Sequence, residues 1–246
     1  MTGFLSRCGL MLAASMLAQT PLSAQTVITY TGTVTSGTDT AGIFGAPQSS
    51  LAGASFTAVY SLIDSLPGAR GSTISGYYDG GTSVGFASPQ SAVLTINGIS
   101  IPFSGNFYSD AFQQNGNTTL GDQTYHEADQ RTTASGIEST NVLYTSMFSN
   151  VHNIVGSNVM TVPIDYTAQP GDAPFGYVEF VNRNTGTSVR QYQLVANLLP
   201  SRVIIRGTPQ TSAVPEPATW AMMLIGFGAI GTRIRRRSRS RTPELA

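Results

Sequence analysis

In the region from about Thr26 to Gln210 of this 246-residue chain, apolar residues nowhere recur at the spacing of a helix over three consecutive turns. Apolar and polar residues instead alternate within short runs rich in valine, isoleucine, threonine and tyrosine, and these runs are separated by Gly, Asn and Ser. Alternation with a period of two is typical of strands that bury one face. Because apolar residues make up 41% of the chain, which is enough for a sizeable core, the region is predicted to fold as an all-β domain.

Two hairpins are predicted within this domain. Two β-branched runs flank Asn97-Gly98, a dipeptide that tolerates the positive φ angles of a two-residue hairpin turn. A polar loop, NRNTGT, joins predicted strands at residues 175–181 and 188–198. Other strands are predicted at residues 26–34, 55–63 and 202–207. Many short strands with polar turns favour a sandwich or jelly-roll-like fold.

One predicted strand, residues 55–63, defines a clear inward face. Alternation places four apolar side chains on that face: Phe56, Ala58, Tyr60 and Leu62.

The first 24 residues have the layout of a secretory signal peptide. Arg7 precedes an apolar run over residues 9–18, Pro21 follows, and small Ala24 occupies the expected position before the cut. The apolar run is too short to cross the roughly 30 Å of membrane hydrocarbon. We therefore expect the Sec translocon to export the chain and signal peptidase to cut it between Ala24 and Gln25.

Cleavage at this position would leave the mature chain without cysteine, because Cys8 is the only one. Disulfides, thiolate metal sites and cysteine nucleophiles are then excluded together.

Charge is distributed unevenly along the chain. Residues 25–214 hold six arginines and eleven acidic residues, a net charge of −5, whereas residues 233–246 hold six arginines and one glutamate, a net charge of +5. The acidic domain argues against nucleic acid as a partner.

The C-terminal part has three sections: a linker at residues 208–214, an uncharged run at residues 218–232, and an arginine-rich end. The 15-residue run is about 22 Å long as a helix, which is short for a membrane span. Trp220 suits a membrane interface, and Pro217 suits the first turn of a helix. We expect one transmembrane helix at about 218–232. Arginines that follow it would hold the end in the cytoplasm as a stop signal: Arg233, Arg235, Arg236, Arg237 and Arg239.

The same run contains GFGAIG at residues 226–231, which fits the G-x-G-x-x-G pattern of dinucleotide-binding loops. Such a loop must follow a strand, open a helix and precede an acidic residue by about 20 positions. Here no strand precedes the glycines and an arginine cluster follows them. The glycines are explained by the tolerance of membrane helices for glycine, and no cofactor is expected.

The segment VPEPATWAMMLIGFGAIGTRIRRR contains a PEP motif, a Trp-Ala pair, an apolar run and an arginine cluster, in that order. It resembles a PEP-CTERM protein-sorting segment of the PEPxxWA form. The matching positions are Pro215, Glu216, Pro217, Trp220 and Ala221, and the segment extends over residues 215–246. The resemblance implies a Sec-exported protein of an exopolysaccharide-producing Gram-negative bacterium. It also implies that an exosortase, a membrane protease, recognises the PEP motif as substrate. The protein would be tethered to the inner membrane with its ectodomain in the periplasm, and processing would release it to the cell surface or matrix, where exopolysaccharide is a further candidate partner.

Residues 25–207, which precede the linker, are expected to form the ectodomain. Tyr30–Pro47 and Leu51–Leu62 more weakly resemble the β-rich ectodomains found upstream of such tails. From the residues themselves we predict a strand, a glycine-rich loop and a second strand, with Asp39 stabilising the turn.

The ectodomain is expected to have no catalytic residue and no metal site. It contains no H-E-x-x-H motif. A strand through His126 and Glu127 would point them to opposite faces, so they could not share a metal ion. His126 and His152 are expected as solvated loop residues. The aspartates are expected to serve turns: Asp39, Asp64, Asp79, Asp110, Asp122 and Asp172.

Two alternatives remain open at this point. The ectodomain could be a secreted carbohydrate-active enzyme or a lectin, with sugars stacking on four tyrosines: Tyr77, Tyr78, Tyr108 and Tyr125. The chain could also be a single-pass membrane protein that is never cut. The leading interpretation is a non-enzymatic surface or matrix protein.

Overall fold

The computed structural model describes residues 25–64, 66–73, 76–116 and 121–207. These residues form antiparallel strands without any helix, which confirms the prediction of an all-β domain. The thirteen strands are β1 (Gln25–Asp39), β2 (Ser49–Ser50), β3 (Ser55–Ile63), β4 (Arg70–Ser72), β5 (Tyr77–Gly80), β6 (Gln90–Ile96), β7 (Ile99–Phe103), β8 (Tyr108–Gln114), β9 (Asp122–Ala134), β10 (Ile137–Ser149), β11 (Ile164–Thr167), β12 (Phe175–Asn184) and β13 (Arg190–Gly207).

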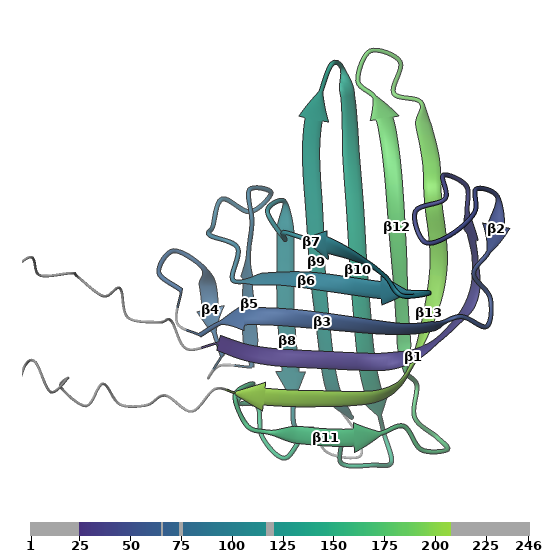
Figure 1. The fold of residues 1–246 in the computed structure, drawn as a ribbon. Helices are drawn as coiled ribbons and strands as arrows, with labels where there is room; N and C mark the ends of the chain where they lie inside the picture. The colour runs from purple at the N-terminus through teal and green to yellow at the C-terminus, as the bar shows by residue number, and fades with distance from the viewer. Residues whose placement is uncertain (1–24, 65, 74–75, 117–120, 208–246) are drawn as a thin grey trace, which may run out of the picture.

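All of these strands belong to a single sheet. Its order is β4-β5-β8-β9-β10-β12-β13-β1-β3-β6-β7, with β2 paired to β1 and β11 paired to β13. The expected sandwich is therefore one curled antiparallel sheet whose two parts face each other. Figure 1 shows the strands β8, β9, β10 and β12 crossing behind β1, β3 and β6.

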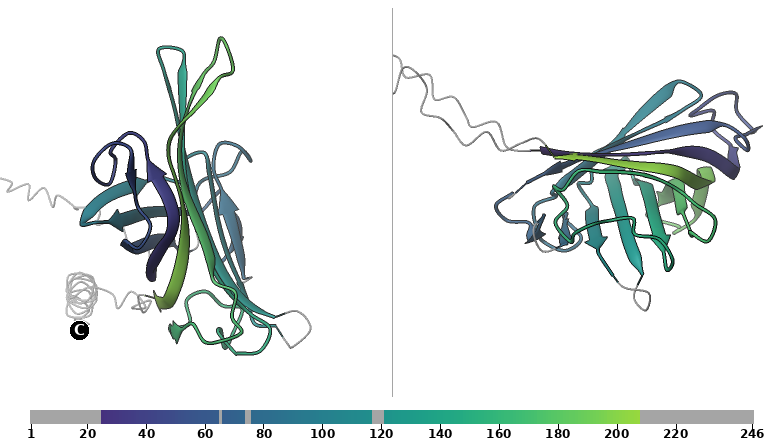
Figure 2. Two further views of the ribbon diagram at one scale, coloured as in Figure 1. Left: turned by 90° about the vertical axis from the view of Figure 1, so that its right-hand side faces the viewer. Right: turned by 90° about the horizontal axis from the view of Figure 1, so that it is seen from below.

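The long strands β1 and β13 pass from one part of the sheet to the other. Their pairing shifts register between Thr31 and Gly32, opposite Ser201, and such bulges bend strands at the corners of crossed β-layers. A side chain at Gly32 would collide with the carbonyl oxygen of Leu199, so the corner requires glycine. Figure 2 shows the resulting two layers from the side and from below.

The core lies between these layers. The predicted inward face of β3 is confirmed, because all four of its apolar side chains are buried. Tyr60 contacts Tyr30 of β1 edge to face, with ring centroids 6.1 Å apart. At one end of the core, Phe180 of β12 packs edge to face against Phe44 and Phe103.

Both predicted hairpins are present. Asn97 and Gly98 have φ angles of 53° and 78° and join β6 to β7. The second hairpin joins β12 to β13. The predicted last strand at residues 202–207 is present, as the end of β13, which is continuous with the strand predicted at residues 188–198.

The predictions for residues 1–24, 208–214 and 215–246 lie outside the described residues. Within the part of the chain that the structure describes, no helix is long and apolar enough to cross a membrane. Thr26 pairs with Gly207, so the two ends of the described chain lie side by side.

Candidate functional site

The face of β8, β9, β10 and β12 that points away from β1 and β3 carries a row of aromatic side chains, which we call the outer face. On β9, His126 points inward and contacts Tyr30, so its neighbour Tyr125 points outward. The register places Tyr125 opposite Phe112 of β8, and Tyr144 of β10 opposite Tyr177 of β12. These side chains form a continuous row across four strands.

The rings of this row contact one another in sequence. Centroid separations are 5.1 Å for Phe112 and Tyr125, 5.7 Å for Tyr125 and Tyr144, and 5.6 Å for Tyr144 and Tyr177. The first and last pairs are nearly parallel, with interplanar angles of 18° and 20°. Phe175 ends the row and is 51% exposed, whereas the other four rings are half-buried. The rings therefore overlap and leave part of the row open to solvent.

Five carboxyl groups share this face with the aromatic row: Asp79, Asp110, Glu127, Asp129 and Glu179. Asp110 lies opposite Asp79 on one side and opposite Glu127 on the other. Glu127 in turn lies opposite Tyr144, so the aromatic and acidic residues alternate across the sheet.

Two of these acids, Asp79 and Asp110, bond to neighbouring side chains that stabilise their negative charge. Arg70 of β4 makes a two-pronged ion pair with Asp79. Asp110 accepts hydrogen bonds on Oδ2 from the hydroxyls of Tyr108 and Tyr125, at 3.1 and 3.0 Å. The tyrosines thus cover Asp110, which is only 6% exposed.

The remaining carboxylate oxygens have fewer partners. Oδ1 of Asp110 and Oδ1 of Asp129 are buried without a hydrogen bond, and Asp129 is 9% exposed. The side-chain carboxylates of Glu127 and Glu179 make no hydrogen bond or ion pair with any described residue, although the backbone carbonyl of Glu127 accepts a bond from the Gln90 side chain. An acceptor that is removed from water without a donor is unfavourable, so this part of the face is incompletely satisfied.

The pKa values of these acids follow from that environment. Burial, and then the charge of Asp110, raises the pKa of Glu127 to about 7. Burial and the charge of Glu127 raise the pKa of Asp129 to about 8, although Arg131 opposes the shift. Burial also raises the pKa of Asp110, despite the two tyrosine hydrogen bonds. The carboxyl groups are therefore held where an added positive charge would stabilise their ionised forms.

The four tyrosines proposed as sugar-stacking residues divide into two groups. Tyr77, Tyr108 and Tyr125 lie on the outer face by their register with Phe112 and Asp129. Tyr78 does not, because it is buried and its hydroxyl accepts a hydrogen bond from the Leu66 amide. Sequence reasoning missed four residues of the row, since the signal lies in the alternation of β8, β10 and β12: Phe112, Tyr144, Phe175 and Tyr177.

The expectation that His126 is a solvated loop residue is wrong. It lies within β9 and is 1% exposed between the rings of Tyr30 and Tyr60. Nδ1 lies 3.0 Å from the Tyr30 hydroxyl, which itself donates to the Thr124 carbonyl. Since the single hydroxyl proton is used, His126 must donate from Nδ1, leaving Nε2 as a buried acceptor without a partner. Glu127 points to the opposite face, as predicted.

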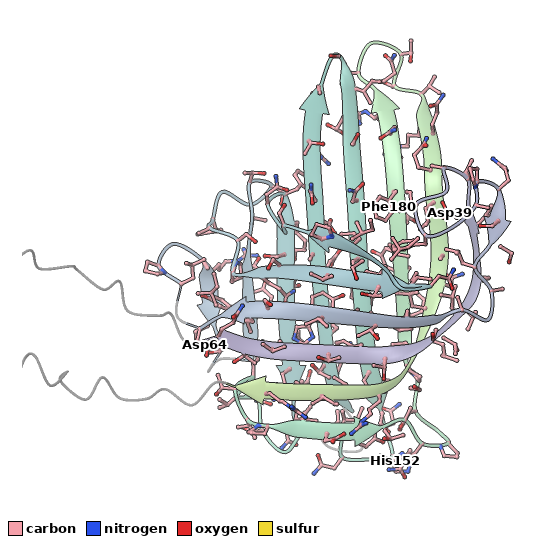
Figure 3. The ribbon with its side chains drawn as sticks, in the orientation of Figure 1. Asp39, Asp64, His152 and Phe180 are labelled. Carbon is pink, nitrogen blue, oxygen red and sulfur yellow. The ribbon has the colours of Figure 1, made fainter. Side chains whose placement is uncertain are left out.

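His152 takes part in a group that superficially resembles part of a catalytic triad. Its Nδ1 lies 2.8 Å from Asp172 Oδ1, at the lower end of the molecule in Figure 3. Ser149, however, bonds to the Asp172 carboxylate and is 1% exposed. Burial would raise the pKa of Asp172, but hydrogen bonds from Ser149, the Gln169 amide, His152 and Tyr166 together lower it to about 2. In a catalytic triad the nucleophile bonds to the imidazole, whereas Ser149 bonds to the carboxylate of Asp172. The group therefore lacks the arrangement of a triad and stabilises a loop.

Three of the aspartates accept hydrogen bonds from loop amides, as the prediction that they serve turns requires. Asp39 accepts hydrogen bonds from the amides of Gly42, Ile43 and Phe44, in the loop near β2 in Figure 3. Asp122 and Asp172 likewise accept bonds from loop amides.

Asp64 lies in the turn directly after β3, and its carboxylate accepts a hydrogen bond from the Thr26 hydroxyl of the neighbouring strand. For the last two aspartates the prediction is wrong. Asp79 and Asp110 lie within strands and belong to the outer face.

Within the described ranges, no group of three His, Cys, Asp or Glu side chains is arranged to hold a metal ion. The sorting residues Pro215, Glu216, Pro217, Trp220 and Ala221, and the arginines 233–239, lie outside those ranges. Of the expected cleavage site, Gln25 is described and begins β1.

Comparison with protein families finds a PEP-CTERM protein-sorting motif at residues 213–238, which confirms the resemblance inferred from the sequence. No curated protein and no solved structure matches the chain.

Proposed function

We propose that this chain is a surface or matrix protein of an exopolysaccharide-producing Gram-negative bacterium, cut first by signal peptidase between Ala24 and Gln25. The observation that carries the proposal is the PEP-CTERM protein-sorting motif at residues 213–238, which indicates an exported protein targeted by an exosortase. In the proposed sequence of events, residues 218–232 tether the chain in the inner membrane and the arginines remain in the cytoplasm. Exosortase then recognises Pro215-Glu216-Pro217 and releases the ectodomain.

The arrangement of the ectodomain supports this order. Its two ends are adjacent on the central strands β1 and β13, so the membrane linker leaves from the same side of the domain where the mature chain begins. Residues 208–214 can reach at most about 24 Å when fully extended. In the proposed arrangement the PEP motif follows directly after this linker, between the folded domain and the membrane, where a membrane-embedded protease could reach it.

We further propose that the ectodomain acts by binding and not by catalysis. His126 is enclosed in the core, and the acid next to His152 is held by Ser149, Tyr166 and the Gln169 amide. Neither histidine is arranged with a nucleophile among the described residues.

The aromatic row favours a saccharide as the bound ligand. Half-buried rings in contact across four strands offer apolar edges and faces, while adjacent carboxyl and phenol groups offer hydrogen bonds. Sugars have the same combination of apolar C–H surfaces and hydroxyls, and aromatic side chains with a polar tip suit such ligands.

Replacing Pro215, Glu216 and Pro217 with alanine tests the sorting proposal. The variant should accumulate as a longer, membrane-retained form, because the protease no longer recognises it. The matched control replaces Thr208, Pro209 and Gln210 of the linker with alanine and should be processed normally. Intact-mass analysis of the exported proteins reads both termini together, and identical mass and location for the PEP variant and the wild type would refute processing at this motif.

A further inference from the structure

We propose that the outer face binds a saccharide that carries ammonium groups, such as a polymer of β-linked glucosamine. This inference rests on the saccharide-binding function proposed above and names the class of saccharide.

The charge of the face is the first argument. Five carboxyl groups lie beside the aromatic row, and three arginines share their face by register: Arg70, Arg131 and Arg183. The first two are already paired with acids. Arg70 pairs with Asp79. Arg131 lies over the ring of Phe107, 3.4 Å from its centroid, and faces Glu138 at 3.6 Å. No other arginine among the described residues contacts these acids, so an anionic polysaccharide such as a polyuronate would be repelled.

The unpaired acceptors are the second argument. Asp110 and Asp129 are each more than nine-tenths buried, and each has one carboxylate oxygen without a hydrogen-bond partner. Asp110 lies opposite Glu127 on the neighbouring strand, and Asp129 lies two residues from Glu127 on the same face of β9. An ammonium group has three donors and no acceptor, so it matches a site with an excess of acceptors. Hydroxyl groups can also donate, but a bond from an ionised donor to a carboxylate is about twice as strong.

The aromatic row is the third argument, because it distinguishes a sugar from a bare cation. The ring of Tyr144 contacts Tyr125 and Tyr177 and lies opposite Glu127 on the neighbouring strand. A cation beside Glu127 would therefore lie near aromatic rings, whose faces attract positive charge. The apolar surface of the sugar would contact the rings that continue to Phe175. The carboxyl groups do not converge as metal ligands within the described chain, so the geometry suits an extended organic ligand better than an ion.

Binding of three hexasaccharides to the exported protein tests the proposal by calorimetry at pH 7. Hexaglucosamine should bind, neutral cellohexaose should bind at least about tenfold more weakly, and hexagalacturonate should not bind detectably. Added salt should weaken the binding of hexaglucosamine but not that of cellohexaose. Because the carboxyls and the sugar amines both titrate near this pH, binding of hexaglucosamine should also change the number of bound protons, seen as a dependence on the buffer ionisation heat.

Two variants locate the site. Glu127→Gln should weaken hexaglucosamine about tenfold and leave cellohexaose unchanged, whereas Asp165→Asn, which removes an exposed carboxylate from β11, should change neither. Tyr144→Leu keeps an apolar side chain in the sheet and should weaken both ligands. Thermal unfolding of each variant checks that the domain remains folded.

The outcomes separate the two proposals. Equal affinity for cellohexaose and hexaglucosamine, or a silent Glu127→Gln variant, would overturn the ammonium specificity and leave saccharide binding in place. Tight binding of hexagalacturonate would overturn the charge argument. Binding of none of the three would overturn saccharide binding itself, without affecting the proposal on sorting.

Discussion

His126 is predicted to make the domain sensitive to acid. Burial lowers its pKa to about 3, because the imidazole lies inside the core between two tyrosine rings and has no acidic partner. In the unfolded chain the pKa returns to its ordinary value of about 6.5. The unfolded state therefore binds a proton at a higher pH than the folded state. The contribution of His126 to stability is fully present above pH 6.5 and is lost as the pH is lowered towards 3.

The magnitude follows from the two pKa values. Each pH unit between them changes the free energy of unfolding by about 1.4 kcal/mol, so about 2.7 kcal/mol is lost by pH 4.5. In urea denaturation this loss corresponds to a shift of roughly 1 M in the midpoint.

Other groups also titrate over this range, so the measurement compares the wild type with His126→Gln. Glutamine is neutral throughout, and the contributions of the carboxyl groups cancel in the difference between the two proteins. When the pH is lowered from 7.5 to 4.5, the free energy of unfolding of the wild type should fall by about 2.7 kcal/mol more than that of the variant. His152→Gln removes the other histidine and should retain the acid loss. A difference between wild type and His126→Gln that does not vary with pH would refute the assignment of His126 as a buried neutral base.

Three further predictions concern the remaining features. Asp39→Ala removes the acceptor for three loop amides and should destabilise the domain by at least about 3 kcal/mol, whereas Asp39→Asn, which keeps one acceptor oxygen, should lose less; equal losses in urea denaturation would contradict this role. Gly98→Ala places a side chain at a φ of 78° and should cost about 1 kcal/mol, while Gly45→Ala, at an uncrowded position without positive φ, should change stability by less than about 0.5 kcal/mol. Burial raises the folded-state pKa of Asp129 to about 8, so its contribution to stability is present below pH 4 and is lost as the pH rises through 8. Asp129→Asn should remove this dependence, so between pH 5 and 9 its free energy of unfolding should rise by roughly 2 kcal/mol or more relative to that of the wild type. Unfolding free energies that follow the same pH dependence in both proteins would contradict this role of Asp129.

The local parts of the fold were predictable. The turn at Asn97-Gly98 needs positive φ at both positions, and this pair is among those that best tolerate it, so dipeptide and turn correspond directly. The inward face of β3 follows from alternation over nine residues. The role of Asp39 in its loop follows from the preference of aspartate for bonding to amides a few residues ahead.

The errors arose where a side chain is placed by a distant segment. His126 was expected in solvent because the sequence around it is polar, yet β1 and β3 cover it with Tyr30 and Tyr60. Asp110 was expected in a turn because Ser109 precedes it, yet it lies within β8 opposite Glu127. The curl of the sheet likewise depends on the bulge that β1 and β13 share, and their paired residues are about 170 positions apart.

The sequence by itself determined the β content of the domain and the sorting motif at residues 213–238, because strand alternation and a linear recognition motif are properties of neighbouring residues. Only the tertiary structure decided which side chains form the outer face. Asp110, Glu127, Tyr144 and Tyr177 come from four different strands, and they lie in one row because the register of each strand pair aligns them. A shift of one residue in any pair would turn the side chains of one strand to the opposite face, so this surface depends on long-range pairing.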